Sequence, residues 1–151
     1  MSKVIKGQIH FHYIVDPFHF TKRNLLKSFI KNLCKREGKQ VDTINYIFCT
    51  DQFLLELNKT HLKHNTLTDI ITFEYNAPQE PLLSDIYISV ERVKENAPLF
   101  QTSFNRELHR VVFHGALHLC GYKDKKAVQS RLMREKEEEY LLKWFVPRGT
   151  D

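Results

Sequence analysis

The segment VDTINYIFCT, residues 41–50, limits the possible folds more than any other part of the sequence. It is rich in β-branched and aromatic residues and is apolar on both faces, so it predicts a strand in the centre of a sheet. A second segment, GQIHFHYI at 7–14, alternates and predicts a half-buried strand with Ile9, Phe11 and Tyr13 on its apolar face. The chain therefore contains a sheet with at least one covered face.

Helical and strand-like segments alternate over the rest of the chain. The loop NAPQEPLLS, between the last two predicted strands, is too short for a helical crossover, which predicts an antiparallel pair. The predicted helices cover 23–38, 51–62, 90–100 with a break near Pro98, 103–121 and 125–145, and the further strands cover 68–75 and 84–90. We expect one small α+β domain over 1–146, with a mixed sheet of about four strands packed with helices and a frayed tail over 147–151.

Composition excludes several classes of protein. Three scattered cysteines without a CxxC pair argue against a disulfide framework and favour a reducing compartment. The sequence has no signal-peptide pattern at its start and no apolar run long enough to cross a bilayer. We expect a cytoplasmic protein without a membrane partner. The net charge of +5 weakly favours a polyanionic partner.

Residues 114–124, HGALHLCGYKD, carry the strongest chemical pattern. His114 and His118 are four residues apart and share one face of a helix. Gly121 can end the helix in a left-handed turn, which brings Asp124 back toward the two imidazoles. The helix, glycine turn and third ligand of HExxHxxGxxH zinc proteases follow the same count. The pattern predicts one zinc ion on His114, His118 and Asp124, with a fourth position for water.

The alternative is that His114 and His118 are core histidines bonded to the backbone. Burial of two unpaired imidazoles in the apolar run VVFHGALHL would be costly. Gly115 costs about 1 kcal/mol relative to alanine inside a helix, which indicates a close approach of the helix backbone to a neighbour. Gly115 also stands where zinc peptidases carry their glutamate base, which disfavours peptide hydrolysis.

Three sequence blocks between residues 57 and 124 resemble one known family. HGALHLCGYKD resembles the HGxLHLxGYDH signature of the YbeY family of endoribonucleases, which are rRNA maturation factors. LNKTHLKHNTLTDIITF resembles that family's LNxxYRxxDxPTDVLSF, and SDIYIS resembles its GDIxIS. The blocks occur in the family's order, and the first is highly specific.

The resemblance implies a zinc-dependent, single-strand-specific endoribonuclease that matures the 3′ end of 16S rRNA and acts in ribosome quality control. Its partners would be single-stranded RNA, rRNA and ribosomal subunits, and no DNA is expected. The family's first two histidine ligands fall on His114 and His118, and the third falls on Asp124. The family's arginine and tyrosine fall on Leu62 and His61, and Lys123 takes the place of its aspartate.

The residues that act on substrate are less defined. Lys63, His61 and His64 are candidates for holding a phosphate or moving protons, and a solvated polar loop is the alternative for each. Asp85 is a further catalytic candidate, although Asp69 and Asp85 are each typical of cap or turn residues. A basic stripe on the first helix predicts contact with an RNA backbone. The basic stripe consists of Arg23, Lys27, Lys31 and Lys35.

Two other functions compete with a ribonuclease. The helix and turn spacing alone also fits a metallopeptidase-like hydrolase. A zinc-stabilised, ribosome-binding module without catalysis is the second, because Asp124 and Leu62 both depart from the family pattern.

Overall fold

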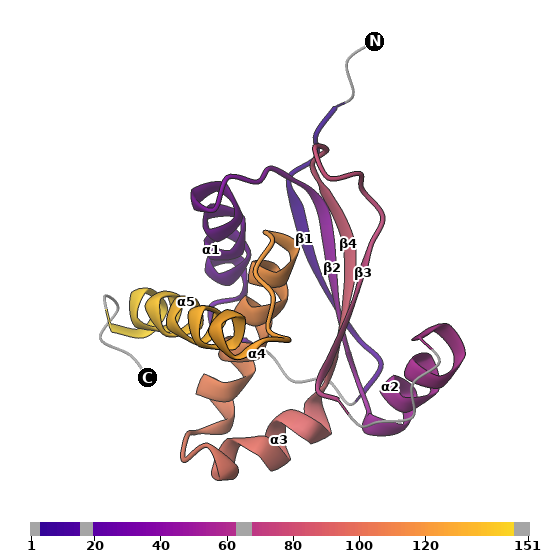
Figure 1. Ribbon diagram of the computed structural model, residues 1–151, viewed down its shortest axis with the longest axis vertical. Coiled ribbons are helices and arrows are strands. Elements are labelled where there is room, and N and C mark those ends of the chain that lie inside the picture. Colours follow the sequence, from indigo (N-terminus) through magenta and orange to yellow (C-terminus); the bar gives the residue numbers. More distant parts are fainter. Residues whose placement is uncertain (1–3, 16–19, 63–67, 147–151) are drawn as a thin grey trace.

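The computed structural model describes residues 4–15, 20–62 and 68–146, and it has one four-stranded sheet packed with helices (Figure 1). The side chains of residues 61 and 62 fall outside this description. The strands are β1 (Gln8–Tyr13), β2 (Val41–Cys49), β3 (Ile70–Glu74) and β4 (Leu82–Ser89). The helices are α1 (Arg23–Arg36), α2 (Asp51–Leu57), α3 (Val90–Leu99), α4 (Phe104–Leu119) and α5 (Ala127–Phe145), and α2 continues into a π-helical segment, η1 (Asn58–Leu62).

The sheet is mixed, and its strands run in the order β1-β2-β4-β3. Strand β2 pairs in parallel with both β1 and β4, which confirms its predicted central place. Strands β3 and β4 form the predicted antiparallel hairpin. The predicted fold class is thereby confirmed.

Most helices cover one face of the sheet. Helices α1, α4 and α5 lie on one side in Figure 1, whereas α2 lies on the other side near one end of the strands. The main core extends from Ile9 on β1 to Phe145 on α5. As the alternation predicted, Ile9, Phe11 and Tyr13 of β1 all pack in or against this core. Helix α4, which carries His114 and His118, is thus held in the interior by apolar packing on most of its surface.

Gly115 explains how closely α4 approaches the sheet. A Cβ atom on this residue would lie 3.1 Å from side-chain atoms of Ile70 and Ile86. The predicted close approach is confirmed, and the contacts come from side chains of β3 and β4. The glycine lets the histidine-bearing helix lie directly on the sheet.

One helix prediction needed correction, and one helix end fell where the sequence predicted it. The predicted helix over 51–62 ends as an α-helix at Leu57, and the chain then widens into η1. The predicted break near Pro98 is confirmed, because α3 ends at Leu99, one residue after this proline. A proline there removes a single backbone bond just before the helix ends, and Gln101 then adopts a positive φ of 55°.

The predicted tail over 147–151 lies outside the described residues. Among the helices that the structure describes, none combines the length and the apolar character that a membrane span requires.

Candidate active site

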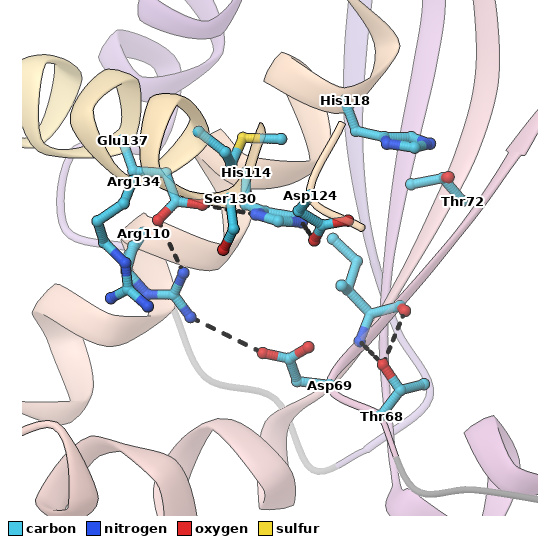
Figure 2. Close-up of a pocket in the computed structure, with 12 residues that line it drawn as sticks. Thr68, Asp69, Thr72, Arg110, His114, His118, Asp124, Ser130, Arg134 and Glu137 are labelled. Carbon is cyan, nitrogen blue, oxygen red and sulfur yellow. Dashed lines mark hydrogen bonds and ion pairs between the residues drawn. The ribbon is translucent and has the colours of Figure 1, made fainter. Parts of the chain in front are cut away.

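A polar pocket with a volume of about 410 Å³ opens between α4, α5 and the start of β3 (Figure 2). It contains all three predicted metal ligands. The lining residues are Thr68, Asp69, Ile70, Thr72, Arg110, His114, His118, Asp124, Ser130, Met133, Arg134 and Glu137.

A buried carboxylate fixes the orientation of His114. The Nδ1 atom of His114 lies 2.5 Å from Oε2 of Glu137, whose side chain is 2% exposed. An ionised carboxylate only accepts hydrogen bonds, so Nδ1 carries the proton and Nε2 is left for the pocket. That Nε2 atom lies 3.4 Å from Oδ2 of Asp124. A carboxylate behind the distal ring nitrogen is the usual support for a metal-binding histidine.

The same carboxylate joins a buried ion network around Arg110. Arg110 donates to both carboxylate oxygens of Glu107, at 2.9 and 2.6 Å, and to Oε1 of Glu137 at 2.9 Å. Its Nη2 atom also lies 3.9 Å from Oδ2 of Asp69. Burial lowers the pKa of Arg110, but the hydrogen bonds and charges of Glu107 and Glu137 outweigh it and hold the pKa above its ordinary value. Arg110 therefore orders the pocket wall while its own charge is compensated.

Two of the three carboxylates beside Arg110, Glu137 and Asp69, have pKa values shifted in opposite directions. Burial raises the pKa of Glu137, but the hydrogen bond from His114 and the charge of Arg110 outweigh it and hold the pKa below its ordinary value. Burial raises the pKa of Asp69, and the charge of Arg110 offsets only part of that effect. A pocket in which neighbouring carboxylates differ in this way can assign them different roles in proton transfer.

His118 lines the pocket but points away from the His114–Asp124 pair, toward Thr72 (Figure 2). Its Nε2 atom lies 3.9 Å from Oε2 of Glu74. Within the residues that the structure describes, no group of three or more His, Cys, Asp and Glu side chains could hold a metal ion as placed. The donor types still fit zinc, since two imidazoles and a carboxylate share one pocket and His114 presents Nε2 to it. The three-residue metal site remains a prediction.

The core-histidine alternative does not describe His114 and His118. Both line the pocket, and their close polar partners are carboxylates instead of backbone groups. His109 on the same helix does fit that description. It is buried, and its Nδ1–H donates to the carbonyl of Asn105 at 2.7 Å.

The turn after α4 forms as the motif predicts. Gly121 has a φ of +109°, a conformation that favours glycine, and the chain then reverses to bring Asp124 into the pocket.

Gly115 bears on the metallopeptidase alternative. A glutamate base at this position, as in a zinc peptidase, would require the side chains of Ile70 and Ile86 to move.

The catalytic candidate Asp85 does not lie in this pocket. Asp85 pairs with Phe73 in the β3–β4 register, whereas the pocket residue Thr72 pairs with the core residue Ile86. Successive side chains in a strand alternate between faces, so Asp85 lies on the sheet face opposite the pocket. There it accepts hydrogen bonds from Asn45 at 3.1 Å and from the hydroxyl of Tyr75 at 2.9 Å. Its contacts are those of a structural residue.

Three more candidates lie outside the described residues. They are Lys63, His64 and the side chain of His61.

The basic stripe lies on α1 and lines no part of the pocket that the structure describes. Arg23, Lys31 and Lys35 are exposed, and Lys27 is half-buried with its Nζ atom 5.4 Å from the centroid of the Phe11 ring. Contact of this stripe with RNA stays a prediction.

Several pocket residues were missed by the sequence reasoning. Asp69 lines the pocket, so its interpretation as a cap or turn residue is incomplete. Arg110 was detectable, because it precedes His114 by four residues on the same helix face. Glu137 and Arg134 lie in the charged run REKEEE and had no distinguishing local signal. Only the packing of α5 against α4 selects them.

Two histidines, three carboxylates and two arginines line one concave pocket above a mixed sheet. Perturbed titratable groups gathered in a pocket of this kind are typical of an enzyme active site. A family model described as "Endoribonuclease YbeY" matches residues 14–144 of the chain. The chain belongs to the YbeY endoribonuclease family, and the resemblance stated from its motifs is confirmed.

Individual relatives agree along nearly the whole chain. The Flavobacterium psychrophilum protein named "Endoribonuclease YbeY" is 47% identical over 141 residues, which are 93% of this chain and 99% of the relative. The Christiangramia forsetii protein of the same name is 43% identical, with 93% of this chain and 97% of the relative covered. A solution structure of a Thermotoga maritima protein matches with a TM-score of 0.60 and 28% identity, over 89% of this chain and 87% of that one.

Proposed function

We propose that the protein is a zinc-dependent, single-strand-specific endoribonuclease that acts in 16S rRNA 3′-end maturation and in ribosome quality control. One observation carries the proposal. In a chain of the YbeY family, His114, His118 and Asp124 line one polar pocket, and Glu137 leaves Nε2 of His114 available there. We place the enzyme in the cytoplasm, with rRNA and ribosomal subunits as partners and residues 1–146 as its single domain.

We propose His114, His118 and Asp124 as the ligands of one zinc ion. Zinc bound there supplies a Lewis acid for a phosphate oxygen and acidifies water. The protein's own contribution is orientation and charge. Glu137 keeps the proton on Nδ1 of His114, and Arg110 keeps Glu137 ionised and in place. Asp69, whose pKa is raised in the pocket, is the carboxylate best suited to hold and release a proton during hydrolysis.

Cleavage of a single-stranded RNA that carries the 3′ region of precursor 16S rRNA tests the proposal. Zinc-loaded wild type, chelator-treated protein and His118→Ala are compared, with zinc content measured on each. His10→Ala is the matched control, because His10 lies on β1 on the face opposite the core. We expect cleavage and about one zinc per chain, as a four-ligand catalytic site requires, in wild type and the control only.

Two results would contradict this expectation. A wild type that holds zinc, unfolds when zinc is removed and leaves RNA intact would favour a ribosome-binding module. A wild type that cuts an unstructured protein but not RNA would favour a metallopeptidase.

A further inference from the structure

Two arginines line the pocket, and they differ in how their charge is compensated. Arg110 is 15% exposed and is held by Glu107 and Glu137 through three hydrogen bonds. Its guanidinium is engaged on more than one side, so an incoming anion would have to displace a buried carboxylate. Arg110 therefore has a structural role in the pocket, and a side-chain cation that binds the substrate would have to be a different residue.

Arg134 is that second cation. It lies on α5 and is exposed, and among the described residues it forms no ion pair with a carboxylate. Its guanidinium carbon lies 5.7 Å from the centroid of the Phe100 ring, and that of Arg110 lies 5.8 Å from the same ring. Phe100 thus contacts both guanidiniums. A ring face at this distance orients an arginine without neutralising it.

The neighbouring residue on the helix adds a hydrogen-bond donor. Ser130 precedes Arg134 by four residues, so the two side chains lie on one face of α5, and both line the pocket. Figure 2 shows the Ser130 hydroxyl directed into the same space as the His114–Asp124 pair. A hydroxyl and a planar guanidinium together donate hydrogen bonds that the oxygens of a phosphodiester can accept.

The charge balance of the protein groups in the pocket favours such a cation beside the metal. Three carboxylates, Asp69, Asp124 and Glu137, line it together with the two arginines. The charge of Arg110 is already balanced by its carboxylate partners. Without Arg134 the protein groups of the pocket would repel a polyanion.

We propose that Arg134 and Ser130 form a phosphate-binding subsite for the RNA strand, with Phe100 holding the guanidinium in place. The inference rests on the proposed function and deepens it, because it names substrate-binding residues on α5. Arg134 contacts a backbone phosphate in this arrangement, so it contributes to binding at every sequence and does not select bases.

Arg134→Gln and Arg131→Gln are the test pair. Arg131 is an exposed arginine of the same helix that does not line the pocket, so its replacement removes the same charge. Steady-state cleavage of single-stranded RNA is measured with zinc content. Binding of a 2′-O-methyl RNA, checked to be intact after incubation, is measured by fluorescence anisotropy at several salt concentrations.

We expect Arg134→Gln to raise KM and Kd about ten-fold, the size of one lost charge-assisted contact, with kcat and zinc content unchanged. The slope of log Kd against log salt should fall by about 0.7 for the lost phosphate contact. Arg131→Gln should match wild type. Arg134→Lys should keep the salt slope but recover only part of the affinity, because lysine lacks the planar fork.

The outcomes separate the two proposals. If wild type cuts RNA and Arg134→Gln behaves as Arg131→Gln does, the subsite is refuted and the proposed function stands. A lower kcat with lost zinc and unchanged Kd also refutes it, since Arg134 would then act through the metal site. If wild type neither binds nor cuts RNA, the proposed function fails and the subsite fails with it.

Discussion

Replacement of Glu137 by glutamine tests whether the buried carboxylate behind His114 prepares the metal site. The carboxylate accepts from His114 and Arg110 at once, through different oxygens. A glutamine has one acceptor oxygen, so one donor loses its partner and meets an amide N–H₂ group instead. Arg110 keeps two bonds to Glu107, and the loss therefore falls mainly on His114.

The structure sets the size of the expected effect. One charge-assisted hydrogen bond contributes about 1.5–3 kcal/mol to stability. We expect Glu137→Gln to lower the free energy of unfolding by that amount, less than the roughly 3–5 kcal/mol of an orphaned buried charge, because Arg110 remains paired. Loss of the carboxylate behind a histidine ligand weakens metal binding by about 10–100-fold.

The loss of stability in Glu137→Gln should also depend on pH. The pKa of Glu137 is lowered in the folded protein, so its ionisation stabilises the fold above the unfolded pKa of about 4.3. That stabilisation is lost as the pH falls through the lower folded pKa. The stability difference between wild type and Glu137→Gln should therefore be constant near neutral pH and disappear in acid.

Urea unfolding and chelator competition for zinc measure the two effects. Glu138→Gln is the matched control, because Glu138 is the next residue of α5, is 56% exposed, and pairs with Arg106 at the surface. An exposed pair of that kind contributes about 1 kcal/mol or less. Zinc affinity within two-fold of wild type in Glu137→Gln would refute the role assigned to this carboxylate.

Three further perturbations test other parts of the structure. Asp69→Asn should raise the midpoint of urea unfolding at pH 7 and lower kcat. The pKa of Asp69 is raised in the folded protein, so ionisation of this carboxyl costs stability as the pH rises through the folded pKa. Equal stability of wild type and Asp69→Asn would contradict this. Gly121→Ala should lower the free energy of unfolding in urea by about 1–2 kcal/mol, because the φ of +109° disfavours a side chain. It should also weaken zinc binding, because this turn sets the path of the chain to Asp124. Unchanged zinc affinity would show that the turn does not position the metal site. Replacement of Lys31 and Lys35 together by alanine should lower the slope of log Kd against log salt for RNA binding by about 1.4. An unchanged slope would exclude the basic stripe from the interface.

Local pattern was sufficient for much of the fold. The apolar run of β2 predicted a central strand, and the short loop before β4 predicted the antiparallel hairpin, because both depend on side-chain periodicity and chain length. The end of the regular α2 helix at Leu57 was not predictable in this way. Its continuation NKTHL contains no glycine or proline to end a helix, and local pattern does not distinguish the two helical geometries.

The residues of the candidate site likewise fall into two groups, those that local sequence pattern predicts and those that only contacts between distant elements bring together. Spacing along the chain was sufficient to select His114, His118, Gly121 and Asp124, since a helix face and a glycine turn place these residues within eleven positions of one another. The contact of Glu137 with His114 and the place of Arg134 in the pocket depend on the packing of α5 against α4. The structure also placed Asp85 on the far face of the sheet, where strand alternation directs it. Contacts between elements distant in sequence depend on how the helices pack over the sheet, and no local spacing encodes that packing.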